Sequence, residues 1–330
     1  MIKRAYGCLI GSAIGDAMGM PASFMSPEKI KRIYGRINGF LPPDKEQIPH
    51  GNLTEGKITD DTEESLIIAE VLTQAGRFDQ ALFIEKMKRW AIDADMLNST
   101  IIGPSTRRFL EAILNDGDPR ETGKIGDTNG GAMRVAPIGI FFHGDVPEAI
   151  RAAIVSGEIS HGSKPGLAST AAIAAAIAAA VEGNCSSADV ISAALTGAEA
   201  GEKAGFDIPA PSVAARINLA KEIVDAHRGE SVDALSYRLY QVIGASMKSY
   251  ESIPLSLGVF YAADGRFENG LLAAINTGDD ADTNGAIVGA LCGAFSGVDA
   301  IRPEWIQKLR ETNPIDFERI AHDLLNTAKH

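Results

Sequence analysis

Apolar residues recur at intervals of three and four positions along most of the chain, as expected when one face of each helix is buried. Strand-like alternation is scarce, and the sequence contains neither a βαβ rhythm nor a phosphate-binding Gly-rich loop of the Walker or dinucleotide type. The pattern therefore predicts an all-α protein, with helices over residues 63–74, 80–96, 106–114, 147–156, 167–181, 188–204, 213–226, 232–243, 255–263, 268–276, 282–296 and 317–327.

Residues 34–58 interrupt this helical pattern. A long irregular loop between two helices is predicted by the closely spaced Gly35, Gly39, Pro42, Pro43, Pro49, Gly51 and Gly56. Long ordered loops are often functional, although a simple surface excursion has the same composition. No linker divides the sequence, so we expect residues 1–330 to form a single domain.

Composition narrows the class of partner. The apolar fraction is 45% and the aromatic fraction only 6%, so the core must be built from small and aliphatic residues in closely packed helices. A net charge of −12 argues against nucleic acid and anionic membranes as main partners. The most apolar runs, residues 167–181 and 286–295, are shorter than the roughly 18–20 residues that span a bilayer.

The cysteines predict a reducing environment. Cys8, Cys185 and Cys292 lie in apolar or small-residue surroundings without CxxC spacing, so we expect reduced, buried thiols in a cytoplasmic protein. Residues 1–20 place basic residues before an apolar stretch, but Asp16 interrupts that stretch. A signal peptide is therefore not expected.

Two acidic clusters stand at the predicted starts of helices. Residues 59–62 read Thr-Asp-Asp-Thr, and residues 280–283 read Asp-Ala-Asp-Thr. Each cluster alone is typical of a helix N-cap, because acids are favoured at helix N-termini. Asp61 and Glu64 also have the spacing of a capping box.

Together the two clusters favour a metal site. Adjacent carboxylates repel each other unless a cation neutralises them, and hard cations such as Mg²⁺ or Mn²⁺ take carboxylate, hydroxyl and water oxygens. Asp280 and Asp282, separated by one Ala, can direct two oxygens at one centre. No His or Cys spacing indicates zinc. Two half-sites facing each other could hold two ions.

Glycines recur at every fourth position in two segments. They are Gly7, Gly11, Gly15 and Gly19 near the N-terminus, and Gly285, Gly289, Gly293 and Gly297 after the second acidic cluster. On a helix each set forms a smooth stripe, and its cost in helix propensity is offset if another helix packs closely there. A further interpretation is that these two helices cross near the site and bring Asp16 towards Asp280.

Four segments, taken in order, resemble the ADP-ribosylglycohydrolase family. Each motif is weak alone, but their order is specific, and they extend from the N-terminus to about residue 297. They are Gly11-Ser12-Ala13-Ile14-Gly15-Asp16-Ala17-Met18-Gly19, Thr59-Asp60-Asp61-Thr62, Asn129-Gly130-Gly131-Ala132-Met133-Arg134-Val135-Ala136-Pro137, and Asp280-Ala281-Asp282-Thr283 with the Gly-Ala helix that follows.

The resemblance implies a compact, multi-helix single domain with a central cleft that holds two Mg²⁺ or Mn²⁺ ions. It implies a hydrolase that cleaves an N- or O-glycosidic bond at the anomeric carbon of a ribose. Asp60 and Asp280 are expected to be catalytic, with Asp280 orienting a water molecule or accepting its proton. The metal ligands implied by the resemblance are Thr59, Asp60, Asp61, Asp280, Asp282 and Thr283.

The resemblance also implies a substrate loop, in which the backbone of Asn129 and its glycines approaches the ligand. The alternative is a helix N-terminus that Asn129 caps. For Arg134, the favoured interpretation is a buried residue that holds the loop through a carboxylate. The expected substrate-binding residues are Ser23, Asp127, Thr128, Asn129, Gly130, Gly131 and His161.

Three positions depart from the family pattern. Ser23 stands where many members have a Glu that guards the site or acts in catalysis. Asp279 replaces a usual Gly, and Asp127 lies near where relatives bind a diphosphate. These departures leave the substrate open. The family resemblance makes an ADP-ribosyl conjugate, on its own or on a protein, the leading substrate. An unphosphorylated nucleoside-like riboside is the runner-up, and an inactive ADP-ribose-binding module is a third possibility.

Overall fold

The expected all-α class is confirmed in the computed structural model, which describes residues 1–328. Within that range the only extended pairings are isolated bridges. The α-helices are α1 (Ile2–Gly19), α2 (Pro27–Tyr34), α3 (Asp60–Ala75), α4 (Gln80–Asp93), α5 (Pro104–Leu114), α6 (Pro119–Gly123), α7 (Gly130–Met133), α8 (Ala136–Phe141), α9 (Val146–Gly157), α10 (Lys164–Glu182), α11 (Ser187–Ala204), α12 (Val213–Ala226), α13 (Val232–Ile243), α14 (Ser249–Ala262), α15 (Phe267–Thr277), α16 (Ala281–Ser296), α17 (Pro303–Thr312) and α18 (Phe317–Thr327), and the 3₁₀ helices are η1 (Met20–Ala22), η2 (Met96–Asn98) and η3 (Val298–Ala300).

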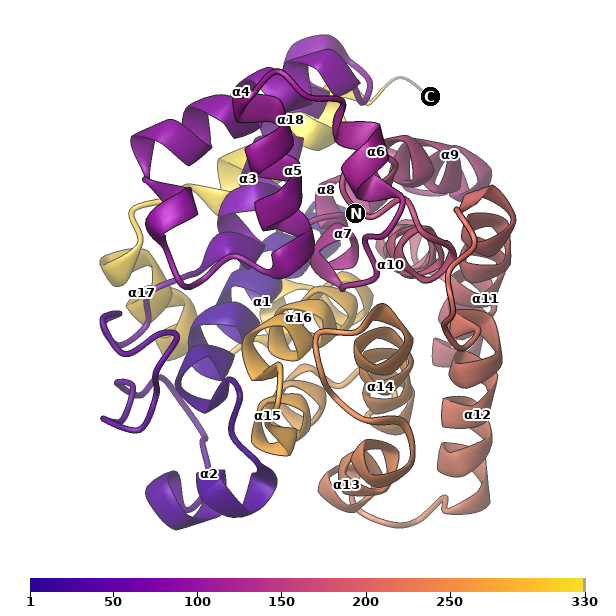
Figure 1. Ribbon diagram of the computed structural model, residues 1–330. Helices are drawn as coiled ribbons and strands as arrows, with labels where there is room; N and C mark the ends of the chain where they lie inside the picture. Colours follow the sequence, from indigo (N-terminus) through magenta and orange to yellow (C-terminus); the bar gives the residue numbers. More distant parts are fainter. Residues whose placement is uncertain (329–330) are drawn as a thin grey trace.

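Helices α1 and α16 form an antiparallel pair in the middle of the molecule (Figure 1). A Cβ atom added to Gly15 would lie 2.0 Å from the carbonyl oxygen of Gly285, so the two backbones touch. The helix-packing interpretation of the glycine stripes is therefore confirmed. Gly297 is the exception, because it follows α16 with a φ of 79° and ends the helix. The opposed pairs are Gly7 with Gly293, Gly11 with Gly289, and Gly15 with Gly285.

Helix α10 is the main core helix beside this pair. It packs against α8, α9, α11 and α16, and alanines fill most of its length. By length and composition it is also apolar enough to cross a membrane, and 89% of that apolar stretch is buried inside the protein. Such burial is what the core helix of a globular domain shows.

Most predicted helices are present within a few residues of their expected ends. The predicted helix 255–263 is wrong at its start, because α14 begins at Ser249 and carries Pro254 in its interior. The predicted helix 80–96 is too long. It ends at Asp93, and Asp95 then adopts a left-handed φ of 50°. Helices α2, α6, α8 and α17 were not predicted from the sequence.

The predicted loop between α2 and α3 is irregular, as expected, and it is anchored to the body of the protein. The buried side-chain amide of Gln47 donates to the carbonyl oxygens of Met20 and Ser23, at 3.1 and 2.8 Å. Near the other end, the amide of Asn313 donates to the carbonyl oxygen of Gly56 at 2.7 Å. This loop therefore holds a fixed course past the ends of α1 and α16.

Candidate active site

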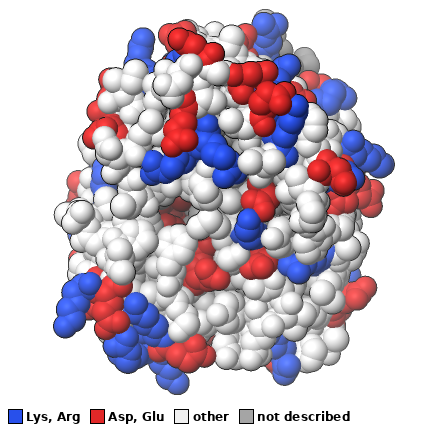
Figure 2. Space-filling model, in the orientation of Figure 1, with Lys and Arg blue, Asp and Glu red and all other residues white. Residues whose placement is uncertain are grey.

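A cavity lies where the N-terminal ends of α3 and α16 meet the Asn129 loop. Acidic side chains are visible inside a hollow near the centre of the face in Figure 2. The cavity is lined by Phe24, His50, Asp60, Asp61, Ile101, Gly103, Thr106, Thr128, Asn129, Gly130, Met133, Met247, Asp280, Asp282 and Thr283. The two acidic clusters, more than two hundred residues apart in sequence, thus share one cavity.

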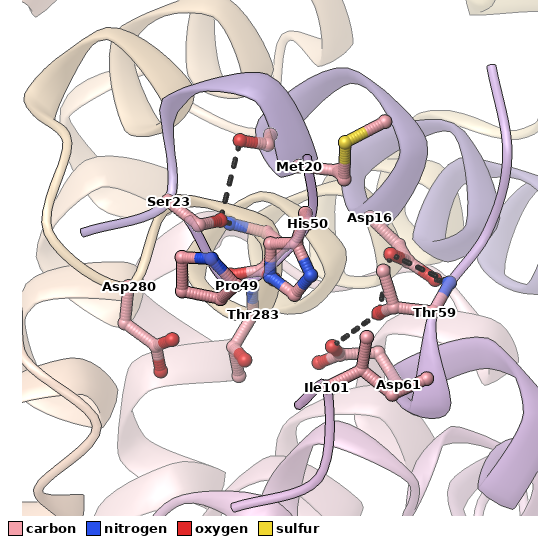
Figure 3. Close-up of polar contacts among 12 residues, drawn as sticks. Asp16, Met20, Ser23, Pro49, His50, Thr59, Asp61, Ile101, Asp280 and Thr283 are labelled. Carbon is pink, nitrogen blue, oxygen red and sulfur yellow. Dashed lines mark hydrogen bonds and ion pairs between the residues drawn. The ribbon is translucent and has the colours of Figure 1, made fainter. Parts of the chain in front are cut away.

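The first cluster is fixed by Asp16 of α1. Its carboxylate accepts hydrogen bonds from the backbone N–H of Thr59 at 2.9 Å and from the Thr59 hydroxyl at 2.8 Å (Figure 3). The Thr62 hydroxyl donates to the same carboxylate at 2.5 Å. Asp16, which belongs to another helix, therefore provides the hydrogen-bond acceptor for the backbone at the start of α3. The side chain of Thr59, the N-cap residue, does not cap the helix. The capping-box interpretation of Asp61 and Glu64 is wrong.

The carboxylate of Asp61 is left partly unsatisfied. The Thr59 hydroxyl donates to its Oδ2 at 3.0 Å, whereas its buried Oδ1 has no hydrogen-bond partner among residues 1–328. Asp60 lines the cavity beside it and is 5% exposed. A buried, unpaired carboxylate oxygen is costly unless something else binds it, which is the role of a cation in such a site.

The second cluster is held by Asn129 and by Ser23. The Asn129 side-chain amide donates to Oδ2 of Asp280 at 2.5 Å, and Ser23 Oγ accepts from the backbone N–H of Asp282 at 3.3 Å. Asn129 stands at the N-cap position of α7, but its side chain does not cap that helix. Instead it connects the predicted substrate loop directly to the second acidic cluster.

His50 is a residue of this site that the sequence did not reveal. It comes from the irregular loop and is 2% exposed, and its Nε2 lies 2.9 Å from Oδ2 of Asp282. In the view of Figure 3, its ring lies beside Pro49, above Thr283 and Asp61. A lone His carries no pattern. The docking of Gln47 beside Met20 and the hydrogen bond from the Thr100 hydroxyl to the Pro49 carbonyl oxygen hold this part of the loop here, although the Gly- and Pro-rich composition did indicate an unusual loop.

Burial and mutual repulsion raise the pKa values of most carboxylates in the site. Burial raises the pKa of Asp16 to about 6, against hydrogen bonds from Thr62 and Thr59. Burial and the charge of Asp282 raise the pKa of Asp280 to about 8. The pKa values of Asp60 and Asp61 also lie well above the ordinary range, because both groups are buried among other carboxylates.

Asp282 is the exception. Burial acts to raise its pKa, but the hydrogen bond and charge of His50 outweigh this effect and lower it. His50 in turn has a raised pKa, because its contact with Asp282 and the charges of nearby carboxylates outweigh burial. The two groups thus favour each other's charged forms. The remaining carboxylates still lack a counter-charge within the cavity.

The donor chemistry of this site fits a hard divalent cation. Carboxylate and Thr hydroxyl oxygens face one cavity, and Asp61 Oδ1 is buried without a partner. Within residues 1–328, however, no three His, Cys, Asp or Glu side chains are gathered closely enough to form a metal cage by themselves. Water, hydroxyl or substrate oxygens would therefore complete the coordination, as is usual for Mg²⁺.

The Asn129 loop forms one wall of the cavity. Thr128, Asn129 and Gly130 line it, whereas Gly131 faces away. A Cβ atom added to Gly131 would lie 2.2 Å from Oγ1 of Thr170. The glycine at 131 is therefore required by packing against α10 rather than by approach of a ligand.

The remaining predicted substrate residues lie behind this lining. The buried His161 imidazole contacts Thr128 Oγ1 at 3.1 Å, and its pKa is well below the ordinary value because of burial and the charges of Arg134 and Arg108. Asp127 pairs with Lys248 at 2.6 Å. Together with the buried Ser23, these residues support the walls, and their binding of substrate stays a prediction.

Arg134 holds the loop in the manner expected from the sequence. Its guanidinium lies 2.6 Å from Glu64 of α3, with both side chains fully buried, and it donates to Ser160 Oγ at 2.7 Å. The same guanidinium lies over the ring of Phe83, 5.0 Å from its centroid. One ion pair thus ties the first acidic helix to the substrate loop and to the segment before α10.

Comparison with known proteins gives a consistent result. The family model described as ADP-ribosylglycohydrolase matches residues 1–330. The uncharacterized protein YegU of Escherichia coli (strain K12) is 35% identical over 322 residues, 97% of this chain and 95% of that protein. The ADP-ribosyl-[dinitrogen reductase] glycohydrolase of Rhodospirillum rubrum is 26% identical, covering 93% of this chain and 90% of that protein.

A solved structure also resembles the whole fold. It is described as an ADP-ribosylglycohydrolase-related protein complex and superposes with a TM-score of 0.72 at 26% identity. The match covers 99% of each chain. Sequence family and fold therefore agree over the same residues that build the cavity.

Proposed function

The chain belongs to the ADP-ribosylglycohydrolase family and is a hydrolase of glycosyl bonds. We propose that it cleaves the ribosyl bond of an ADP-ribosyl conjugate and that two Mg²⁺ or Mn²⁺ ions bind in the cavity. The observation that carries this proposal is the meeting of two buried acidic helix starts in one cavity. The family is metal-dependent, and the identity and number of the ions belong to the proposal.

The proposed ligands come from the two helix starts. Such ions would orient ribose hydroxyls and lower the pKa of a bound water. The chain's own contribution is to hold the oxygens in place. Asp16 orients the first set through its Thr59 contact, and Asn129 orients Asp280. The ligands are Thr59, Asp60, Asp61, Asp280, Asp282 and Thr283.

In the proposed reaction, water adds to the anomeric carbon while the glycosidic C–N or C–O bond breaks. Asp280 accepts the proton of the attacking water in its ionised form. Cations bound beside it would favour that form, because they would offset the charge of Asp282 that raises the pKa of Asp280 in the metal-free protein. Asp60, in the first acidic cluster, is the second catalytic residue of this proposal. The leaving group takes up a proton as it departs.

A second candidate is hydrolysis of an unphosphorylated, nucleoside-like riboside. One observation favours it: the described residues that line the cavity include four carboxylates but no Lys or Arg. Lys248 is paired with Asp127, and Arg107 donates to the backbone carbonyls of Leu97 and Ser99. A diphosphate in this cavity would depend on bound metal ions for its counter-charge.

A substrate panel separates the two candidates. The purified protein is incubated with Mg²⁺ or Mn²⁺ and either ADP-ribosyl-arginine or unphosphorylated N-ribosides, and release of ADP-ribose or of free ribose is measured. Turnover of the ADP-ribosyl conjugate supports the main proposal, and turnover of ribosides alone supports the second. Tight binding of ADP-ribose without turnover of any compound would contradict both and would indicate a binding module.

A further inference from the structure

Phe24 has an unusual backbone conformation. Its φ is 61°, in the left-handed region where bulky side chains are disfavoured. Among the described non-glycine residues, the others with positive φ are all Asp or Asn, whose short polar side chains tolerate it. They are Asp95, Asp116, Asn184, Asp264 and Asp279. Phe24 is the one aromatic residue of this group, so its conformation is imposed by its surroundings.

Backbone pairing with the second acidic segment imposes it. The N–H of Phe24 donates to the carbonyl oxygen of Asp279 at 2.5 Å, and the N–H of Asp279 donates to the carbonyl oxygen of Met25 at 2.8 Å. Asp279 itself has a φ of 55°. Glycine adopts a positive φ freely, which explains why a Gly is usual at this position in the family. The turn that carries Phe24 is thus fixed to the residue immediately before Asp280.

The Phe24 ring lies at the cavity and is not covered by the protein. It lines the cavity although 47% of the residue is exposed. Its centroid is 6.5 Å from that of His50, which touches Asp282. An exposed aromatic ring held in a strained conformation beside a buried acidic site is typical of a functional position rather than of a packing contact.

We propose that Phe24 is a specificity-determining residue whose ring stacks on a planar leaving group attached to the ribosyl carbon. The inference rests on the proposed function, in which the acidic clusters hold the ribose. The leaving group is then one bond from the anomeric carbon. The Phe24 ring is the neighbour of the His50 ring, which itself contacts Asp282. Either the heteroaromatic base of a riboside or the guanidinium of ADP-ribosyl-arginine has the required flat face.

Matched substrate pairs test the stacking role in both substrate classes. One pair is a purine riboside and the O-methyl riboside, and the other is ADP-ribosyl-arginine and ADP-ribosyl-serine. In each pair the sugar is shared and only one leaving group is planar. Phe24→Ala should raise KM about 10- to 100-fold for the planar member, with a smaller change for the other, because base–aromatic stacking has that strength.

Three variants separate stacking from folding. Phe206→Ala is the matched control, because Phe206 is 50% exposed but lies outside the cavity lining, and KM should be unchanged. Phe24→Leu keeps apolar bulk without a flat face and should lose most of the preference. Phe24→Gly should raise the melting temperature, since glycine adopts a positive φ freely, while KM for the planar member still rises.

Equal KM changes for both members of a pair, or none, in Phe24→Ala would overturn the stacking role while leaving the proposed hydrolase intact. If the wild-type protein hydrolyses no compound of the panel, the proposed function fails instead. Calorimetric titration with the purine riboside and with ADP-ribosyl-arginine then still decides the role of Phe24. Binding about tenfold weaker in Phe24→Ala supports it, and equal or undetectable binding to both proteins overturns it.

Discussion

Nε2 of His50 lies 2.9 Å from Oδ2 of Asp282, so a side chain from an irregular loop reaches the start of the central helix α16. This contact gives Asp282 a counter-charge that the other carboxylates of the cavity lack. The site therefore contains one carboxylate whose negative charge is paired with His50 and several whose charges have no such partner. The pH dependence of stability should reflect that division.

The metal-free protein should lose stability between pH 6.5 and 8. Asp280 has a pKa of about 8 in the folded state, against an ordinary value of 3.8. Across this range the folded protein binds a proton that the unfolded chain has already lost, so rising pH favours unfolding. The raised pKa of His50 acts in the same direction. Thermal denaturation in EDTA measures the effect, and a melting temperature that rises over this range would contradict it.

Added Mn²⁺ should stabilise the protein more at pH 8 than at pH 6, because a bound cation takes the place of those protons. The same thermal denaturation with Mn²⁺ present gives the shift at each pH. Asp280→Asn provides the control, since it removes the titrating group and should flatten the pH dependence in EDTA.

Arg134→Met should destabilise the protein by about 3–5 kcal/mol, because it leaves the carboxylate of Glu64 buried and without its charged partner. Urea denaturation measures the change. Adding Glu64→Gln to Arg134→Met should restore part of the loss, since the stranded charge is then gone. A single variant within about 1 kcal/mol of wild type would show that this ion pair does not tie α3 to the substrate loop.

Gly15→Ala should destabilise the protein by about 1–3 kcal/mol or more, even though alanine favours helices. The added methyl group would lie 2.0 Å from the carbonyl oxygen of Gly285, and a backbone atom cannot move aside as a side chain can. Gly39→Ala is the matched control, because nothing lies within 4 Å of a Cβ there. Equal melting temperatures for the two variants would refute the close packing of α1 on α16.

His161 should make the protein less stable as pH falls below about 6.5. Its pKa is well below the ordinary value in the folded state, so between the two pKa values only the unfolded chain binds the proton. Stability is therefore gained as pH rises to 6.5 and is lost on acidification. Comparing the pH profiles of wild type and His161→Gln isolates this contribution. Profiles that stay parallel between pH 5 and 6.5 would exclude it.

The sequence predicted most of the long helices and missed several short ones, including α2 and α8. Helix α2 has Ile30, Ile33 and Tyr34 at helical spacing, but it is only eight residues long, so this pattern was too short to be recognised beside the Gly- and Pro-rich segment that follows. Helix α14 was predicted six residues short at its start because a proline normally ends a helix, whereas Pro254 lies in the interior. The pairing of α1 with α16 was predictable, since glycines repeated at every fourth position are typical of a helix face on which another helix packs closely.

The acidic part of the site was predictable because its carboxylates are adjacent in sequence and each cluster begins a helix. The contributions of His50 and Phe24 were not. His50 is a lone histidine whose position depends on the docking of Gln47, and the strain of Phe24 arises from backbone pairing with Asp279. Such contacts between distant segments leave no local pattern. Asp16 was an intermediate case, expected near Asp280 and found bound to Thr59.

The most direct test of the account is the metal-dependent release of sugar from a ribosyl substrate by wild type, Asp60→Asn and Asp280→Asn. We predict that EDTA abolishes the wild-type activity, that Mn²⁺ or Mg²⁺ restores it, and that each variant loses at least about 100-fold in kcat/KM at saturating metal. Phe206→Ala, tested alongside, should keep full activity. Sugar release that survives EDTA, or that either Asn variant retains, would contradict a hydrolase built on the two acidic helix starts.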